Sequence, residues 1–376
     1  MTDDLTPGLY IHVPFCRSKC RYCGFYSTTS LDQAEDFLTA LLREMDICRP
    51  SLRSFDTIYI GGGTPSLLSV KDMAALLEGA AGKFTISSCA EITLEANPAD
   101  IDRPRLKAWR RIGINRLNIG VQSFDDNVLH FLGRRHNRKQ AMRAVKTSQD
   151  AGFDNTGIDL IYGAPGQEIT SWAGTLRLAL SLNPAHLSCY QLTVEPDTPL
   201  GLRQTKGEIS LPGEGILADL FFQTSDIIEK AGYTHYEVSN FARNEHFLSR
   251  HNQKYWDHTP YLGLGPGAHS FDGRRRWWNQ RDLSAYVRDM GRGGPPVNAL
   301  ETLTDEQLRL EAVFLGLRTK NGIHLHDYKR RYGYDLLSEK AETISLLVEK
   351  ELLEIKNGRL QPTLAGLAVA DSLALI

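Results

Sequence analysis

The chain has 376 residues, a formal net charge of −2, a charged fraction of 23% and a hydrophobic fraction of 41%. These are ordinary values for a folded protein, and they argue against a disordered or fibrous chain. A charge near zero gives no general attraction to nucleic acid or to an anionic membrane, and no apolar run approaches the roughly 20 residues of a membrane-spanning helix.

The first residues, Met1-Thr2-Asp3-Asp4, are acidic and lack the basic and apolar parts of a signal peptide. We therefore expect a cytoplasmic protein. Six cysteines are too few for a disulfide scaffold in a chain of this length.

Six short β-prone segments follow one another through the first half of the chain. We expect strands at Leu9–Val13, Thr57–Ile60, Glu91–Leu94, Arg116–Val121, Gly157–Tyr162 and His186–Leu192. Helical periodicity lies between them, for example at Ala34–Ile47, Val70–Ala81 and Lys139–Ala151. This alternation predicts parallel strands with right-handed crossovers. The expected fold class is therefore α/β, a partial (β/α)6 barrel, open or closed, with its chemistry at the C-terminal strand ends.

The alternation loosens after residue 195. We expect a helix at Ile216–Ala231 and a strand at Thr234–Val238, followed by a segment, 240–279, rich in aromatic residues, histidine and glycine. Gly291–Pro296 has the composition of a linker. Beyond it we expect helices at Thr304–Leu317 and Ala341–Lys350, a hairpin at Glu354–Leu360 built on Asn357-Gly358, and a last helix at Thr363–Leu375.

These elements predict three parts: a barrel domain at 1–240, an extension of the barrel at 241–295, and a helical, winged-helix-like module at 296–376. A winged helix often binds DNA. No helix in this tail is densely basic, so we expect a structural module and no nucleic-acid partner.

Three cysteines, Cys16, Cys20 and Cys23, have the spacing C-x3-C-x2-C directly after the first expected strand. Three thiolates on one tight loop can hold three irons of a [4Fe–4S] cube and leave the fourth iron open to another ligand. Basic residues within the motif would favour the thiolate state: Arg17, Lys19 and Arg21. The alternatives are a zinc knuckle of Cys20, Cys23 and His12, or three buried thiols.

Together with Gly61-Gly62-Gly63-Thr64-Pro65, this motif resembles the radical S-adenosylmethionine (SAM) superfamily. Six segments are similar to the coproporphyrinogen dehydrogenase group and its haem-chaperone relatives of the HemW type: YIHVPFC, GGGTPS, LEANP, GVQSF, GRRH and DLIYGAPGQ. The likeness covers nearly the whole chain. It implies a [4Fe–4S] cluster on the three cysteines, with SAM on the open iron.

The resemblance also implies the residues that contact SAM, at successive strand ends. Gly62, Gly63 and Thr64 would let the backbone approach the methionine amino group, because glycine has no Cβ. Glu95 would accept hydrogen bonds from the ribose hydroxyls, and Arg134 could grip a carboxylate with two hydrogen bonds. The full implied set is Tyr10, Tyr22, Gly62, Gly63, Thr64, Glu95, Gln122, Arg134 and Asp159.

Three features separate haem chaperones from dehydrogenases in this resemblance. Phe25 stands where the dehydrogenases have a fourth cysteine, and the first cluster cysteine is already at position 16, which leaves no room for their long N-terminal arm. The hexapeptide from His251 to Trp256 matches the H-N-x-x-Y-W pattern of the haem-chaperone group. Histidine can ligate haem iron, so His251 is the candidate haem ligand, with His258 and His269 as weaker substitutes.

We therefore expect a haem chaperone that binds the cluster, SAM and haem as cargo, and that delivers haem to an acceptor such as a respiratory enzyme. The resemblance implies a homodimer and names no catalytic residue. The main alternative is an oxygen-independent coproporphyrinogen III dehydrogenase, in which a 5′-deoxyadenosyl radical abstracts a propionate β-hydrogen. A third alternative is a binding protein whose cluster is only structural.

Overall fold

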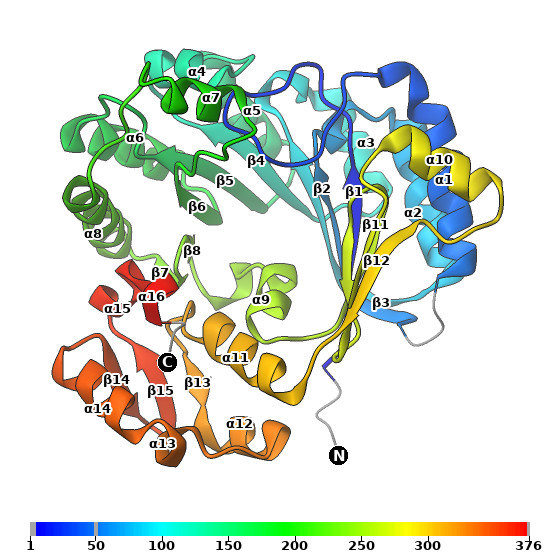
Figure 1. Cartoon of the computed structure of the whole chain (residues 1–376). Coiled ribbons are helices and arrows are strands. Elements are labelled where there is room, and N and C mark those ends of the chain that lie inside the picture. The colour runs from blue at the N-terminus through cyan, green and yellow to red at the C-terminus, as the bar shows by residue number, and fades with distance from the viewer. Residues whose placement is uncertain (1–4, 49–51, 374–376) are drawn as a thin grey trace.

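The computed structural model describes residues 5–48 and 52–373. In this part of the chain, one sheet of 12 strands has the order β12-β11-β10-β9-β1-β2-β3-β4-β5-β6-β8-β7 (Figure 1). Strands β1 to β6 pair in chain order, and every one of these pairs is parallel. The α/β prediction is confirmed, and the barrel is open, because the first and last strands of the sheet do not pair with each other.

The first half of the chain forms the predicted alternation. Its strands are β1 (Gly8–Val13), β2 (Ser54–Gly62), β3 (Thr85–Ala96), β4 (Arg116–Gln122), β5 (Asn155–Tyr162) and β6 (His186–Gln191). Its helices are α1 (Ala34–Ile47), α2 (Val70–Lys83), α3 (Arg103–Arg111), α4 (Asp126–Leu132), α5 (Arg138–Asp150), α6 (Ile169–Ser181), α7 (Pro199–Thr205) and α8 (Glu214–Lys230). Local signals fix their starts, since Asn137 and Gln140 form a capping box at α5 and Ser69 caps α2.

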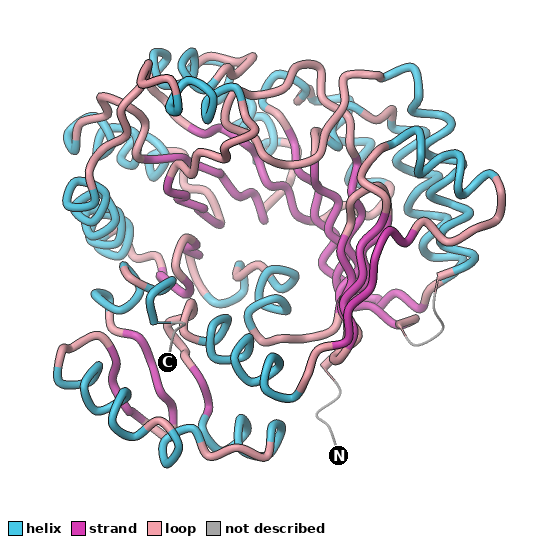
Figure 2. The backbone as a smooth tube through the Cα atoms, in the orientation of Figure 1, coloured by secondary structure: helices cyan, strands magenta, loops and turns pink. Residues whose placement is uncertain are grey.

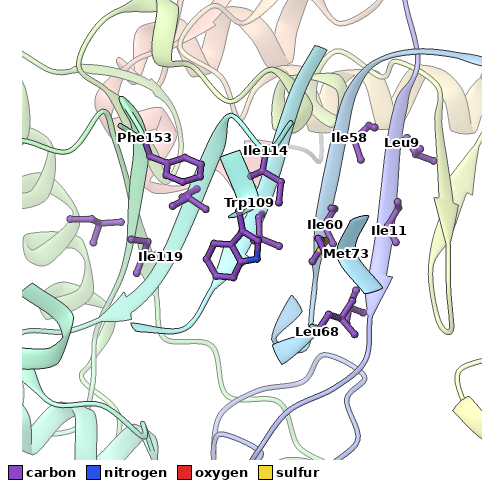
Figure 3. Close-up of a cluster of buried hydrophobic side chains, with 14 of the residues drawn as sticks. Leu9, Ile11, Ile58, Ile60, Leu68, Met73, Trp109, Ile114, Ile119 and Phe153 are labelled. Carbon is purple, nitrogen blue, oxygen red and sulfur yellow. The ribbon is translucent and has the colours of Figure 1, made fainter. Parts of the chain in front are cut away.

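The helices cover the outer face of the sheet, and the core lies between the two layers (Figure 2). Every second strand residue points into this core: Leu9 and Ile11 on β1 are fully buried, as are Leu117 and Ile119 on β4. Figure 3 shows Leu9, Ile11 and Ile119 gathered with Trp109 of α3. The residues between them therefore face the opposite, inner side of the sheet.

The sheet extends beyond the six parallel strands on both sides. Antiparallel strands β7 (Thr234–Glu237) and β8 (Asn240–Ala242) follow β6. On the other side, β9 (Tyr261–Leu264) pairs in parallel with β1, and β10 (His269–Phe271), β11 (Arg275–Asn279) and β12 (Val297–Thr302) continue as antiparallel strands. Two helices belong to this region: α9 (Arg250–Trp256) and α10 (Leu283–Gly291).

The C-terminal part, in orange and red in Figure 1, is a helical module around a small sheet of order β13-β15-β14. Its elements are α11 (Asp305–Gly316), β13 (Ile323–His324), α12 (Leu325–Tyr332), α13 (Leu336–Glu339), α14 (Ala341–Glu349), β14 (Leu353–Lys356), β15 (Arg359–Pro362), α15 (Leu364–Ala368) and α16 (Ala370–Leu373). The predicted hairpin is present, and its turn residues Asn357 and Gly358 both have positive φ.

One predicted element needs correction. The last helix is not continuous: Val369, at φ −120, separates α15 from α16, and residues 374–376 lie outside the described part. The three-part division stays a prediction, although β12, placed in the third part, pairs with β11 in the large sheet. Within the described ranges, no helix is long and apolar enough to cross a membrane.

Candidate functional site

The inner face of the sheet is polar where the outer face is apolar. Arg116 and Asn118 of β4 point inward between the core residues of that strand, and Tyr59 of β2 and Glu95 of β3 occupy equivalent inner positions. This arrangement lines the inside of the open barrel with groups that can form hydrogen bonds.

A cavity of about 900 Å³ lies on this inner face at the C-terminal strand ends. Its walls bring together most of the residues predicted from the sequence: Cys16, Cys20, Tyr22, Cys23, Gly62, Gly63, Thr64, Glu95, Gln122, Arg134 and Asp159. Tyr10 and His251, which were also predicted, are not part of its lining. The cavity is therefore the candidate site for the cluster and for SAM.

The cysteine loop follows β1 and is pinned by backbone hydrogen bonds. The Cys16 amide donates to the Thr28 carbonyl at 2.9 Å, and the Thr64 amide donates to the Phe15 carbonyl at 2.7 Å. Cys16 Sγ lies 3.4 Å from Thr64 Oγ1. All three motif cysteines are free thiols. Burial raises the pKa of Cys23, so a positive partner is needed if its thiolate is to form.

The three basic residues of the cysteine motif differ in what they contact. Arg17 points to Asp100, at 3.9 Å, and Arg21 donates to the Phe131 carbonyl at 3.3 Å, whereas Lys19 does line the cavity. Instead, the guanidinium of Arg134 donates to Cys20 Sγ at 3.3 Å. Arg134 therefore supports the thiolates directly, a role not expected from the sequence.

The geometry fits a cluster better than a single zinc ion. Among the described residues, no group of three or more His, Cys, Asp or Glu side chains converges on one metal position. His12, the proposed zinc partner, has both ring nitrogens engaged, with Tyr26 O and Tyr10 OH each at 3.0 Å. Cysteines that each ligate a different iron of a cube need no common point. The cysteine set therefore suits a [4Fe–4S] cluster.

The glycine run allows β2 to approach the cysteine loop closely. A Cβ on Gly63 would lie 2.7 Å from the Phe15 carbonyl oxygen, and Gly62 has φ +108 with His12 beside it. The Gly63 amide donates to the Val13 carbonyl at 2.8 Å. Glycine is required at both positions, and the backbone there forms one wall of the cavity.

Two carboxylates face the cavity from neighbouring strands. Glu95 accepts hydrogen bonds from Tyr59 OH at 2.7 Å and from the Gly62 amide at 3.1 Å, yet burial raises its pKa to about 7. Burial likewise raises the pKa of Asp159 to about 6, although Asn118 Nδ2 donates to both of its oxygens, at 2.9 and 2.8 Å. These are fixed acceptors suited to ligand hydroxyl groups.

Two other cavity residues have polar atoms without partners. Gln122 ends β4 at φ +67, in the left-handed region, and its Oε1 is buried without a hydrogen bond. Arg134 donates to the Gly120 carbonyl at 2.5 Å, but its Nε is buried and also lacks a partner. Strained backbone and unpaired buried groups concentrate where a ligand completes the structure. Both residues therefore suit a polar ligand such as SAM.

His251 lies in α9 and is almost fully buried. Its Nδ1 is 2.8 Å from Thr57 Oγ1 and its Nε2 is 3.0 Å from Tyr255 OH. Burial lowers its pKa to about 3. The predicted haem ligand thus has no free ring nitrogen in this arrangement, and its ring instead packs on Tyr59 at 5.2 Å between centroids. Tyr10 also stacks on Tyr59, at 6.2 Å.

Sequence reasoning missed Tyr59, Asn118 and Tyr190, all of which line the cavity. Tyr59 and Asn118 hold the two carboxylates in place. The available signal was the period of two: each is a polar residue at an inner position of a strand whose other positions are apolar. That signal marks a face of the sheet, and only the fold shows that these faces share one cavity.

Comparisons with known proteins show which family the chain belongs to. Residues 10–179 match the Radical SAM superfamily, and residues 303–369 match the HemN C-terminal domain. The heme chaperone HemW of Escherichia coli (strain K12) is 41% identical over 266 residues, which are 70% of this chain and 69% of that protein. The heme chaperone HemW of Bacillus subtilis (strain 168) is 34% identical over 348 residues, 92% of each chain.

A solved structure is similar over nearly the whole molecule. It is coproporphyrinogen III oxidase (HemN) from Escherichia coli, described as a radical SAM enzyme. The TM-score is 0.85 at 26% sequence identity, covering 98% of this chain and 89% of that one. The open sheet and the C-terminal module therefore both have a counterpart in a known structure.

Proposed function

Since the chain belongs to the heme chaperone HemW family of the radical SAM superfamily, we propose that it is a haem chaperone that binds haem and passes it to an acceptor protein. The observation that carries the proposal is the match to relatives of that name, which extends over 92% of both chains in one case. Phe25 supports it, because an exposed phenylalanine stands at the cavity where the dehydrogenase pattern has a fourth cysteine.

We propose that Cys16, Cys20 and Cys23 hold a [4Fe–4S] cluster at the mouth of the cavity. When bound, the cluster supplies an open iron that ligates SAM. The chain contributes the surroundings: Arg134 offsets the charge of the thiolates at Cys20, and Lys19 adds a second positive charge to the cavity wall. Three free thiols at one cavity with a buried guanidinium beside them support this assignment.

SAM would fill the rest of the cavity. Glu95, fixed by Tyr59 and the Gly62 amide, would accept hydrogen bonds from the ribose hydroxyls. Gln122 Oε1 and Arg134 Nε would gain the partners that they lack. Tyr22, Thr64 and Asp159 would complete the polar wall, and Gly62 and Gly63 would admit the methionine end.

The acceptor, location and assembly belong to the same proposal. We propose delivery in the cytoplasm to a haem-requiring protein, such as a respiratory enzyme, by a homodimer. The test is haem transfer: protein loaded with one equivalent of haemin is mixed with an apo-haem protein, and the acceptor spectrum is followed. Transfer faster than from free or albumin-bound haemin is expected, and no faster transfer would contradict delivery.

The second candidate is the dehydrogenase, which the structural similarity to HemN favours. Anaerobically reconstituted protein is incubated with coproporphyrinogen III, SAM and a reductant, and the porphyrins are separated by chromatography. If the protein is a chaperone, the incubation should yield no protoporphyrinogen. A separate titration with haemin should give a saturable change in Soret absorbance. Formation of protoporphyrinogen, or a failure to bind haemin, would contradict the chaperone proposal. Bound zinc without iron and sulfide would contradict the assignment of the [4Fe–4S] cluster.

A further inference from the structure

Asp100 is a buried carboxylate next to one wall of the cavity. It ends the short 3-10 helix Pro98–Asp100, shortly after Glu95 of β3, and it is not itself part of the cavity lining. Only 3% of its side chain is exposed. A buried carboxylate is stable only where cations and hydrogen-bond donors surround it. The partners of Asp100 therefore indicate what it does in the fold.

Two arginines meet this carboxylate. Arg135 donates with both terminal nitrogens, from Nη2 to Oδ2 at 2.9 Å and from Nη1 to Oδ1 at 3.4 Å. Arg17 Nε lies 3.9 Å from Oδ1. Among the described residues, neither guanidinium has another carboxylate within 4.0 Å. A contact through two nitrogens fixes the direction of a guanidinium as well as its distance, so Asp100 determines where Arg135 lies.

Each of these arginines is adjacent in the chain to a residue of the candidate cluster site. Arg17 follows Cys16. Arg135 follows Arg134, the residue that donates to a sulfur of the cysteine motif, and Arg135 itself lines the cavity. One carboxylate, that of Asp100, thus holds both the cysteine loop and the segment that supports its thiolates.

Asp100 also joins the turns that follow β2 and β3. The hydroxyl of Ser66, a fully buried residue in the turn after the glycine run, donates to Asp100 Oδ2 at 3.3 Å. The same hydroxyl accepts from the Asn97 amide at 3.2 Å. Arg105 of α3 donates to the carbonyl groups of Asp100 and Leu68, at 3.3 and 2.8 Å. Both turns contribute residues to the cavity wall, so their positions depend on this one buried side chain.

We propose that Asp100 is a positioning residue for the cluster and SAM site. It holds Arg135 and Arg17 beside the cysteine loop, and it limits how much of their positive charge acts on the cluster. The inference rests on the proposed cluster and adds a residue that the motifs did not single out. A cluster becomes more negative on reduction, so uncompensated positive charge beside it raises its reduction potential, and uncompensated negative charge lowers it.

The test compares the reduction potential of the reconstituted cluster in full-length native protein and in variants of this pair, by redox titration followed by electron paramagnetic resonance. Asp100→Asn keeps the shape of the side chain and removes its negative charge, so the potential should rise. Arg135→Gln removes a positive charge, so the potential should fall. The double variant restores the native balance of charge, and its potential should lie between the two, close to the native value.

Binding of SAM, by equilibrium dialysis, is the second measurement. Asp100→Asn should weaken it by about tenfold, because Arg135 is no longer held in place beside Arg134. The control is Asp154→Asn, since Asp154 is exposed and does not line the cavity, and this variant should match the native protein in both measurements. If Asp100→Asn does not fold, Arg135→Gln decides the test by the direction of its shift.

The outcomes distinguish this inference from the cluster assignment on which it rests. Native protein without bound iron, sulfide and SAM would overturn both. Native protein that binds them, with native potentials and SAM affinities in Asp100→Asn and Arg135→Gln, would overturn the positioning role and leave the cluster assignment standing. Potential shifts in the same direction in these two variants, or an equal effect of Asp154→Asn, would also overturn the positioning role, because the effect would then not depend on this pair of charges.

Discussion

At the scale of single residues, we expect Glu95 to make SAM binding depend on pH. Burial raises its pKa to about 7, so the side chain is roughly one-tenth ionised at pH 6 and nine-tenths ionised at pH 8. The ionised form is the better acceptor for ribose hydroxyls. SAM affinity should therefore rise by up to about tenfold as the pH increases from 6 to 8. Equilibrium dialysis with labelled SAM across this range would measure the change.

The control for this prediction is Glu95→Gln, which keeps the shape and cannot ionise. Its SAM affinity should be lower at pH 8, by about tenfold, and nearly independent of pH. An equally steep pH dependence in the variant would assign the effect to another group. Asp159, with a pKa raised to about 6 by burial, would then be the next residue to change.

The cysteines divide into two groups that a single substitution can separate. Cys20→Ser should abolish the visible absorbance of the reconstituted cluster and lower bound iron, because one iron loses its thiolate ligand. Cys89→Ser is the matched control, since Cys89 is exposed on β3 and does not line the cavity. Equal iron and sulfide content in the two variants would contradict the assignment of the cluster.

At the scale of elements, periodicity predicted the outer half of the molecule well. The strand from Arg116 and the helix Ala34–Ile47 are where the sequence placed them, because burial of alternate or every third to fourth residue determines both. The segment 240–279 gave no such signal. It forms α9 and four short strands, β8 to β11, and one of these, β9, pairs with β1, which lies far away in the sequence.

In the candidate site, too, local patterns predicted some residues and only the fold places the others. Motif residues such as Cys16 and Glu95 lie together because each follows or ends a parallel strand, and parallel strands end at one edge. The role of His251 as a haem ligand stays a prediction, and the motif does not say which way the ring points. Its contacts with Thr57 and with the Glu91 carboxylate, which accepts from the His251 amide at 3.2 Å, depend on how α9 seats inside the barrel.

Through His251, α9 supports Tyr59, which lines the cavity. His251→Ala should lower the free energy of unfolding by about 2–4 kcal/mol, because it leaves a void and unpaired buried hydroxyls at Thr57 and Tyr255. It should also weaken SAM binding, since Tyr59 loses the ring behind it and holds Glu95 less firmly. Denaturant unfolding and SAM dialysis measure both effects. A native-like stability would contradict this role.

At the scale of the whole molecule, the chain after β12 closes the open side of the barrel. Helix α11 starts beside β12, at one edge of the sheet, and residues 318–320 reach β7, at the other edge (Figure 1). There the Val238 amide donates to the Arg318 carbonyl at 2.8 Å, and the Lys320 amide donates to the Tyr236 carbonyl at 3.1 Å. The segment after β12 therefore connects the two edges of the large sheet, which do not pair with each other.

Glu311 fastens the middle of this connection. Both of its oxygens accept from Arg276 of β11, at 2.9 and 2.7 Å, and His258 Nε2 lies 3.3 Å away. Burial alone would raise the pKa of this carboxyl, but His258 and Arg276 outweigh it and lower the pKa to about 2. A carboxyl whose pKa is lowered in the folded state stabilises the fold at any pH above its pKa in the unfolded chain, which is near 4.3. This contribution is lost as the pH falls toward 2.

Glu311→Gln should therefore lower the free energy of unfolding by about 1 kcal/mol at neutral pH, a modest value because the pair is partly exposed to solvent. The loss should be constant between pH 6 and pH 8 and shrink below pH 4, where the native carboxylate also becomes protonated. Denaturant unfolding at several pH values measures it, with Glu306→Gln, exposed on the same helix, as the control. If both variants are as stable as the native protein at every pH, this ion pair does not hold the tail, and the contacts at β7 hold it instead. The rate at which a protease cleaves the chain after α11 should then also be the same in Glu311→Gln and in the native protein.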